Sequence, residues 1–428
     1  MAAILDLRLN LNNYSSMIDN QFRLAYHDCR NTLLQRLEEP APSRIQLLSG
    51  PRQVGKTTLL LELAKALGDD AVYAAADAPE ASLPGFLDRL FNRARKIAAS
   101  RGRAIVLLDE VHLISEWAAR LKGVTDDLKR RKEPIHVVAT GSAALRLGSG
   151  SRETLAGRFE RLILSHWSAS SLAETFRLER EAAAEFVVRM GSYPGAFSLR
   201  TDEARWSAYI RDSILEPAIG RDILALSTVR RPALLRQIFG IAASSPAQIL
   251  SLQKIRGQLQ DRGALETVAH YLALLEEAFL VASIQKFSKQ DLRRRASPPK
   301  LVTLNNALIS SLDPMGIKAG MQDAPRYGSW VENACLAHAW NSGQRLWYWR
   351  EESLEVDGIL EGSWGSWAIE VKTGRFQIGD LAAILEFCRR NPRFQPLLLC
   401  RESELEVAER AGVQARTWKD FLLDGPPS

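Results

Sequence analysis

Residues 50–57 read Gly50-Pro51-Arg52-Gln53-Val54-Gly55-Lys56-Thr57 and match the pattern GxxxxGK[ST]. The apolar run 45–49 precedes them, and a helical pattern over 56–67 follows and stops at Gly68. Glycines in such a loop let the backbone wrap closely round phosphate groups, so that its N–H groups and the start of the helix face the negative charge. The sequence therefore predicts a P-loop that binds ATP.

Each residue of this loop is expected to contact the nucleotide. Lys56 should reach the β- and γ-phosphates, and the Thr57 hydroxyl should bind Mg²⁺. The predicted nucleotide-binding residues are Gly50, Pro51, Arg52, Gln53, Val54, Gly55, Lys56, Thr57 and Thr58.

Short apolar segments alternate with helical patterns on both sides of the loop. The segments 45–49, 71–75, 104–108, 135–139 and 162–164 are predicted strands. Strands that alternate with helices are typical of a parallel sheet covered on both faces. We therefore expect an α/β fold for residues 44–170.

Polar residues end two of these predicted strands. Asp109 and Glu110 follow the run 104–108; in such a pair the first carboxylate holds Mg²⁺ and the second orients or deprotonates the attacking water. Thr140-Gly141-Ser142 ends the next strand, and the hydroxyl of either Thr140 or Ser142 can hold the same water. These residues predict hydrolysis of the bound ATP, with Glu110 and Thr140 as catalytic residues.

Phosphoryl transfer often uses an arginine from a neighbouring subunit to stabilise the charge of the transition state. Arg158 is our candidate for this role, and Arg152 and Arg161 are its rivals. A second arginine that senses the nucleotide stays open among Arg200, Arg205 and Arg211.

The composition of the chain places only loose limits on the class of protein. The 428 residues carry a net charge of +6, a modest excess that fits a nucleic-acid partner without establishing one. The four cysteines form no CxxC pair and do not cluster with the six histidines, which argues against zinc and against a disulfide framework. Residues 1–17 lack a signal-peptide pattern, and no apolar run is long enough to span a bilayer, so a cytoplasmic protein is expected.

The motifs resemble those of the AAA+ ATPases of bacteria and archaea, from Leu47–Thr57 through Leu107–His112 and Thr140–Ser142 to Ala156–Arg158. Within that group the chain is similar to a large family whose C-terminal half was named a domain of unknown function. The segment Gly191-Ser192-Tyr193-Pro194-Gly195 is similar to that family's GG-x-P segment, with Ser192 in place of the second glycine. The resemblance covers residues from about 44 to 400. It implies a sheet order of 5-1-4-3-2 and a homo-oligomeric ring, commonly of six subunits.

A basic segment in the middle of the chain suggests contact with DNA. Residues 249–260 and 264–277 are predicted helices joined by Asp261-Arg262-Gly263, the outline of a helix-turn-helix. The following segment 281–303 would be the wing of a winged helix. The resemblance favours this because family members share a similar stretch that ends in a Pro-Lys strand, here Pro298-Pro299-Lys300-Leu301. The alternative is a solvated basic loop on a helical lid. The predicted phosphate contacts are Lys286, Lys289, Arg293, Arg294, Arg295 and Lys300.

Acidic residues near the C-terminus follow a nuclease-like order. Glu332 lies in a predicted helix, Asp357 in a strand, and Glu370 and Lys372 project from one face of the partner strand. Carboxylates in this arrangement can hold Mg²⁺ while the lysine orients or activates water. This set resembles the PD-(D/E)xK nuclease superfamily, with Val356 in place of its proline. The resemblance implies a metal site at Glu332, Asp357 and Glu370; it leaves open whether the site cuts DNA or only binds it.

The expected organisation is an N-terminal helical lead-in (1–43), an AAA+ core (44–170), a helical lid or linker (171–245), a winged-helix domain (246–325) and a nuclease-like domain (326–428). The favoured function is an ATP-driven motor that remodels or moves along duplex or branched DNA in repair, recombination or defence, with Mg²⁺-dependent nuclease activity as an option. The first alternative is a signalling or defence switch whose nucleotide state controls a C-terminal effector. A protein-remodelling machine is the second, and it is weakened because no aromatic-glycine pore loop is recognisable.

Overall fold

A computed structural model describes residues 23–141, 155–224, 229–260, 264–288 and 297–427. The chain forms two compact units. The N-terminal unit comprises residues 23–165 together with 220–224, and the C-terminal unit comprises residues 166–219 together with 229–427. Each unit has its own sheet and its own core.

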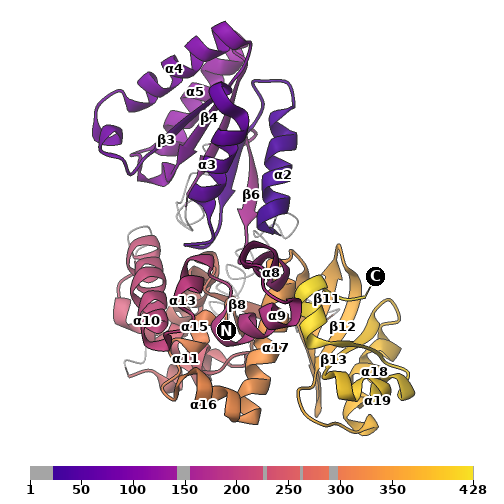
Figure 1. The fold of residues 1–428 in the computed structure, drawn as a ribbon. Helices are drawn as coiled ribbons and strands as arrows, with labels where there is room; N and C mark the ends of the chain where they lie inside the picture. Colours follow the sequence, from indigo (N-terminus) through magenta and orange to yellow (C-terminus); the bar gives the residue numbers. More distant parts are fainter. Residues whose placement is uncertain (1–22, 142–154, 225–228, 261–263, 289–296, 428) are drawn as a thin grey trace. The chain divides into compact units, whose positions relative to one another are not determined.

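The N-terminal unit is built on a parallel sheet of six strands in the order β1-β6-β2-β5-β4-β3 (Figure 1). Counted among the five expected strands, β6-β2-β5-β4-β3 reads 5-1-4-3-2, and β1 is added at the β6 edge. The prediction of a parallel α/β sheet is confirmed. The strands are β1 Arg23–Leu24, β2 Ile45–Ser49, β3 Ala71–Ala75, β4 Ala104–Asp109, β5 Ile135–Thr140 and β6 Phe159–Leu164.

Helices cover both faces of this sheet, as the fully buried strands β2, β4 and β5 require. Helices α4 (Phe86–Arg101) and α5 (Trp117–Arg131) bury Phe91 and Leu121 in one core with Val106 of β4. Successive side chains of a strand point to opposite faces, so Ile105 and Leu107 face the other way. Helix α3 (Lys56–Leu67) contacts β3 and β4 with residues outside that core, and α2 (Tyr26–Leu37) lies beside α3 and β6.

The C-terminal unit contains a mixed sheet of eight strands in the order β14-β13-β12-β11-β10-β8-β9-β7. Strands β10 and β8 pair in parallel through Trp347 with Gln285 and Tyr348 with Lys286. Residues of the expected winged-helix and nuclease-like domains therefore share one sheet within one compact unit. The strands are β7 Gln248–Ile249, β8 Val281–Lys286, β9 Lys300–Thr303, β10 Arg345–Glu351, β11 Leu354–Gly362, β12 Gly365–Val371, β13 Gln395–Cys400 and β14 Gln414–Thr417.

Helices of this unit pack on the sheet and on one another (Figure 1). Phe387 of α18 is buried with Trp349 and Ile359 against one face of the sheet. Within the described residues, no helix is long and apolar enough to cross a membrane. The helices are α8 Ala169–Phe176, α9 Arg180–Met190, α10 Glu203–Tyr209, α11 Pro232–Ser244, α12 Leu252–Gln258, α13 Leu265–Glu277, α15 Ala307–Ser310, α16 Gly316–Gln322, α17 Ala324–Asn341, α18 Ala382–Arg390, α19 Leu405–Arg410 and α20 Trp418–Asp424.

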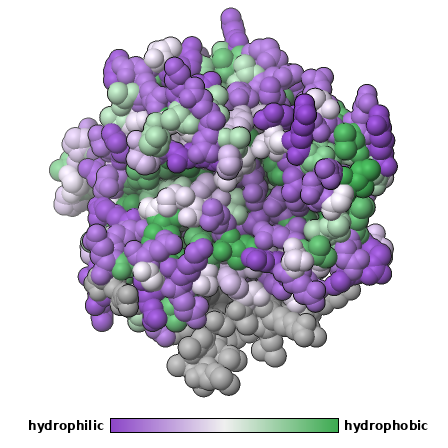
Figure 2. Space-filling model, turned by 90° about the horizontal axis from the view of Figure 1, so that it is seen from below, coloured by the Kyte–Doolittle hydropathy of each residue, from purple (hydrophilic) through white to green (hydrophobic). Residues whose placement is uncertain are grey.

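The face of the molecule seen in Figure 2 is covered mostly by hydrophilic side chains, with apolar side chains gathered in smaller patches between them. Large apolar residues that are exposed occur in both units, for example Leu61 in α3 and Met315 before α16. Scattered apolar residues of this kind are normal on a protein surface and need no partner to explain them.

The segment Gly191–Gly195 packs closely against Asn305 and Ala307. Gly191 has a φ of 68°, and a Cβ there would lie 2.0 Å from Asn305 Oδ1 and 2.4 Å from the Ala307 nitrogen. The Ser192 N–H donates to Asn305 Oδ1 at 3.1 Å, and Asn305 Nδ2 donates to the Ser192 hydroxyl at 3.2 Å. Glycine is needed at 191 because the backbone comes so close, whereas the serine at 192 uses its hydroxyl to satisfy a buried amide.

Candidate active site

The P-loop connects the end of β2 to the start of α3. Its backbone takes a positive φ at Gly50, Gln53 and Gly55, which folds the chain tightly round the helix N-terminus. Lys56 is 6% exposed, and its ammonium donates to the carbonyls of Gly50 at 3.2 Å and Pro51 at 2.7 Å. Burial lowers the pKa of Lys56, and the nearby Glu110 carboxylate opposes that shift. The lysine is thus held over the loop at the place where phosphates are expected.

The ends of β4 and β5 bring Asp109 and Thr140 together, because these parallel strands are neighbours. The Thr140 hydroxyl donates to Asp109 Oδ1 and accepts from the Glu110 N–H at 3.2 Å. The Tyr73 hydroxyl donates to Asp109 Oδ2 at 3.2 Å. Thr140 therefore lies within the acidic pair, while Ser142 lies outside the described residues.

Glu110 adopts a left-handed backbone with a φ of 49°, which is uncommon for a residue with a side chain. Its Oε2 is buried and accepts no hydrogen bond from the described residues. His112 Nδ1 lies 3.2 Å from this oxygen. Burial raises the pKa of Glu110, with Lys56 opposing, and burial lowers the pKa of His112. A carboxylate with a buried oxygen that accepts no hydrogen bond is suited to accept one from a water molecule, or to accept the proton of that water.

The structure adds a partner for the P-loop that no motif indicates. Arg52 makes two hydrogen bonds to Asp222, at 2.8 and 2.9 Å, and Asp222 is 3% exposed. Asp222 belongs to the short segment 220–224, whose chain continues into the C-terminal unit at Val229. The two partners are 170 positions apart in the sequence, so no local pattern indicates their pairing. The loop is thereby tied to a segment far along the chain.

Tyr26 is a second residue that sequence reasoning missed. It begins α2, and a Cβ added to Gly55 would lie 3.3 Å from its ring. The ring therefore packs against the P-loop, and Gly55 is needed for that approach as well as for its left-handed backbone.

These residues fit MgATP. The loop N–H groups and Lys56 suit the phosphates, the exposed Thr57 hydroxyl and Asp109 suit Mg²⁺, and Glu110 keeps a free oxygen. Val54 is fully buried and acts through its backbone, whereas the side chains of Gln53 and Thr58 are exposed. The arrangement can bind a nucleoside triphosphate and direct water at its terminal phosphate.

Arg158 is engaged within its own chain. Its guanidinium makes two hydrogen bonds to Asp126 of α5, at 2.7 and 3.2 Å, and the side chain is 30% exposed. The Arg161 guanidinium lies 6.0 Å from the Phe159 ring centroid, and Arg152 lies outside the described residues. To act in a neighbouring subunit, Arg158 would first leave Asp126.

The C-terminal unit gathers a second set of charged residues. Gly358 lets α17 approach β11 closely, since a Cβ there would lie 2.8 Å from Leu336. This approach brings Glu332 of α17 to Asp357 of β11. Asp357 Oδ2 accepts the Val371 N–H at 2.9 Å.

The remaining predicted members lie on β12 or directly after it. Glu370 is 6% exposed, and the Lys372 ammonium lies 2.8 Å from its Oε1. Burial and the Asp357 charge raise the pKa values of Glu332 and Glu370. For Lys372, burial lowers the pKa but Glu370 outweighs it, so the net shift is upward. The structure thus places all four residues of the nuclease-like pattern in one region.

Lys300 occupies the middle of this acidic centre. It is 1% exposed, and its ammonium lies 2.8 Å from Glu332 Oε1, 3.3 Å from Asp357 Oδ1 and 3.5 Å from Glu355 Oε1. The expectation of an exposed phosphate contact at Lys300 is therefore wrong, because the lysine is buried against the carboxylates of three residues. Lys286 is half-buried at the end of β8, and Lys289, Arg293, Arg294 and Arg295 lie outside the described residues.

The acidic centre does not fit a divalent metal in this arrangement. Among the residues that the structure describes, no three His, Cys, Asp or Glu side chains are placed to hold a metal ion. One oxygen of Glu332 and one of Asp357 already face the Lys300 ammonium, and the other oxygen of Asp357 accepts the Val371 N–H.

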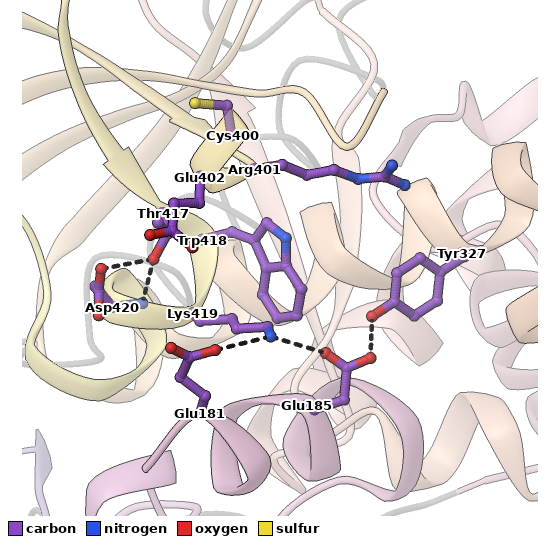
Figure 3. A pocket seen from close by; sticks show the side chains of 10 residues that line it. All are labelled: Glu181, Glu185, Tyr327, Cys400, Arg401, Glu402, Thr417, Trp418, Lys419 and Asp420. Atoms are coloured by element: carbon purple, nitrogen blue, oxygen red, sulfur yellow. Dashed lines mark hydrogen bonds and ion pairs between the residues drawn. The ribbon is translucent and has the colours of Figure 1, made fainter. Parts of the chain in front are cut away.

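A cavity of about 360 Å³ lies elsewhere in the C-terminal unit (Figure 3). Its charged groups largely pair with one another: the Lys419 ammonium lies 3.1 Å from Glu181 and 4.0 Å from Glu185, and Tyr327 donates to Glu185 at 2.7 Å. These bonds join α9, α17 and α20. Trp418 forms part of the wall. No local pattern in the sequence pointed to this cavity.

Three family models match successive parts of the chain. Residues 42–173 match the AAA domain, residues 181–319 match a domain of unknown function (DUF8612), and residues 327–419 match another (DUF4143). The chain therefore carries an AAA domain followed by two domains of unknown function, and the AAA match includes Lys56, Asp109, Glu110 and Thr140 but neither Tyr26 nor Asp222.

The relatives that match most of this chain have no assigned activity. Uncharacterized proteins of Mycobacterium tuberculosis and Mycobacterium bovis are each 27% identical over 342 residues, which is 79% of this chain and 72% of theirs. The ATPase family gene 2 protein homolog B of Mus musculus is 32% identical over 133 residues, 26% of this chain and 18% of its own.

Solved structures resemble the chain only loosely. AMPPCP-bound DnaA from Aquifex aeolicus has a TM-score of 0.31 at 18% identity and covers 58% of this chain and 86% of its own. RuvB of Thermotoga maritima has a TM-score of 0.31 at 20% identity and covers 60% and 87%. Scores of this size bear on neither substrate nor activity.

Proposed function

We propose that this protein is an AAA+ ATPase that uses ATP hydrolysis to remodel or move along duplex or branched DNA, as a helicase or branch-migration motor does. We propose that this activity serves DNA repair, recombination or defence. The observation that carries the ATPase part is the meeting of Lys56, Asp109, Glu110 and Thr140 at the ends of β2, β4 and β5. The AAA domain match over residues 42–173 supports it.

In this proposal each residue has one task. Lys56 contacts the β- and γ-phosphates, and Thr57 and Asp109 hold Mg²⁺, which neutralises charge on the phosphates when it is bound. Glu110 accepts a proton from the attacking water, whose oxygen bonds to the γ-phosphorus as the bond to ADP breaks. Thr140 positions both acidic residues, since its hydroxyl is bonded to the Asp109 carboxylate and to the Glu110 N–H.

The DNA part of the proposal rests on the middle of the chain. Helices α12 and α13 are followed by the antiparallel pair β8 and β9, with β7 on the other side of β9. This is the order of helices and strands in a winged helix. The chain between β8 and β9, residues 287–299, contains the basic residues Lys289, Arg293, Arg294 and Arg295 in its sequence. We propose that this connection is the wing and that its positive charge contacts phosphates.

We also propose that the protein forms a homo-oligomeric ring in which Arg158 acts on a neighbouring subunit, and that the chain has five parts. On that division, residues 246–325 would be the winged-helix part and residues 326–428 the nuclease-like part, although their strands share a sheet. The N-terminal part, residues 1–43, includes α2, whose Tyr26 packs beside the P-loop.

The test follows labelled duplex, fork and four-way-junction DNA with ATP and Mg²⁺ on native gels, alongside phosphate release. Lys56→Ala should lower ATP hydrolysis by about 100-fold or more, because it removes a charge aimed at the reacting phosphate, and should abolish strand or branch products. Lys65→Ala, an exposed lysine at the other end of α3, is the matched control.

Two outcomes would contradict parts of this proposal. Unchanged hydrolysis in Lys56→Ala would refute the assigned nucleotide site. Normal hydrolysis in the unaltered protein, without binding to any of the DNAs and without stimulation by them, would refute the DNA role.

The alternative function is a nucleotide-controlled switch that acts on a C-terminal effector. The Arg52–Asp222 pair favours it, because it ties the P-loop to the segment that leads into the C-terminal unit. A switch would retain nucleotide tightly and turn over slowly, and DNA would leave its rate unchanged. Asp222→Asn should then alter nucleotide release without altering DNA binding.

A further inference from the structure

The acidic centre of the C-terminal unit already contains a cation, the Lys300 ammonium. Lys300 comes from β9, while Glu332 comes from α17 and Asp357 from β11. The ammonium bonds to Glu332 Oε1 at 2.8 Å and to both the side chain and the carbonyl of Asp357 at 3.3 Å. A lysine that is 1% exposed and bonded to three oxygens is held firmly in place.

The oxygens that a metal would need are largely in use. Asp357 Oδ1 faces Lys300 and Oδ2 accepts the Val371 N–H, while Glu370 Oε1 faces Lys372. Only Glu370 Oε2 is buried without a hydrogen-bond partner among the described atoms of these carboxylates. Carboxylates hold Mg²⁺ at about 2.0–2.1 Å, so an ion shared by Glu332 and Asp357 would come into contact with the ammonium and repel it.

We infer that Lys300 is the built-in counter-ion of this centre, so that the C-terminal domain binds no catalytic divalent metal and leaves phosphodiester bonds intact. This goes beyond the proposed ATPase, which neither requires nor excludes a second metal site. It argues against metal-dependent cleavage of DNA, which the sequence pattern of Glu332, Asp357, Glu370 and Lys372 had left open.

The same contacts give Lys300 a structural role. Lys300 is the first residue of β9, and its ammonium bonds to Glu332 of α17 and Asp357 of β11. The centre thus connects β9 to α17 and β11 through charge, in place of binding an ion.

The first test counts bound Mn²⁺ ions by electron paramagnetic resonance in the nucleotide-free full-length protein. The unaltered protein and Asp357→Asn should bind the same number, because Lys300 excludes the ion in both. Lys300→Met should bind about one ion more than the double variant Lys300→Met/Asp357→Asn, because the carboxylates then lack their counter-ion. Lys318→Met, the same change at an exposed lysine of α16, should gain none.

Each opposite result would overturn the inference. An ion bound by the unaltered protein and lost in Asp357→Asn would show that Lys300 does not exclude metal. A folded Lys300→Met that gains no ion would show that something else excludes it. If Lys300→Met fails to fold, Lys300→Gln, which removes the charge but keeps a hydrogen-bond donor for Glu332 and Asp357, should gain the ion in its place.

A second readout follows labelled DNA on denaturing gels with Mg²⁺ or Mn²⁺, with and without ATP. Strands should stay full-length with the unaltered protein. Shortened strands that disappear with Asp357→Asn would refute the inference. Loss of ATP hydrolysis in Lys56→Ala would not affect either readout, so a failure of the proposed motor is distinguishable from a failure here.

Discussion

At the scale of single residues, Glu110 combines three features that suit a catalytic base. Its backbone is left-handed, its Oε2 is buried without a hydrogen bond, and burial raises its pKa. A raised pKa makes the carboxylate a stronger base but also converts it to the neutral acid at a higher pH. Its catalytic form is therefore present above the raised pKa and is lost as the pH falls through it.

We accordingly expect the rate of ATP hydrolysis to fall on acidification at a pH above the usual glutamate range. Glu110→Gln should lower the rate constant by about 10²–10⁴-fold while nucleotide binding persists, because the phosphate-binding loop is untouched. Phosphate release measured against pH, with binding of a fluorescent ATP analogue, checks both points. Glu116→Gln, an exposed glutamate nearby, is the control; an equal loss there would contradict the assignment.

At the scale of elements, the P-loop depends on how closely it passes β6. A Cβ at Gly50 would lie 2.2 Å from the Leu164 carbonyl oxygen, and that oxygen belongs to the backbone of a strand paired with β2. The clash is relieved only if the loop or the strand moves. The shape of the nucleotide site is therefore set partly by a strand that contributes no functional side chain.

Gly50→Ala should destabilise the protein by about 2–3 kcal/mol and weaken nucleotide binding, as measured by urea denaturation and by titration with the ATP analogue. Gly123→Ala is the matched control, because it lies within α5 and its Cβ would meet no atom within 4 Å. That substitution should stabilise by about 0.5–1 kcal/mol, the usual gain for alanine over glycine in a helix. Equal stability of the two variants would contradict the role given to the contact with β6.

At the scale of the whole molecule, the proposed ring predicts that a complete site is shared between subunits. Arg158→Ala removes the arginine that a subunit would give to its neighbour, and Glu110→Gln removes the base that a subunit uses itself. Each variant alone should hydrolyse ATP slowly. A mixture should recover activity, because a Glu110 site can then lie next to an intact Arg158.

Phosphate release from mixtures at several ratios measures this recovery, and Arg161→Ala in place of Arg158→Ala tests the rival arginine. No recovery with either arginine variant, in mixtures shown by sedimentation to contain mixed oligomers, would refute an arginine supplied in trans. Recovery with Arg161→Ala alone would transfer the role to that residue.

Much of the N-terminal unit was predictable because its signals are contiguous. The pattern at 50–57, the acidic pair after an apolar strand and the alternation of strands with helices each lie within a few neighbouring residues. The order of types along the chain also predicted that Glu332, Asp357, Glu370 and Lys372 share a region. By contrast, the choice of Thr140 needed the hydrogen bonds at the ends of β4 and β5.

Local pattern alone established an ATP-binding P-loop with its acidic pair, because backbone geometry and side-chain chemistry there are set by adjacent residues. Only the tertiary structure could show that Arg52 pairs with Asp222, that Tyr26 packs on the loop, and that β8 and β10 merge two expected domains into one sheet. It also reversed the role of Lys300. In the sequence that lysine is one more charge in a basic segment; whether a charge faces water or carboxylates depends on what long-range folding brings next to it.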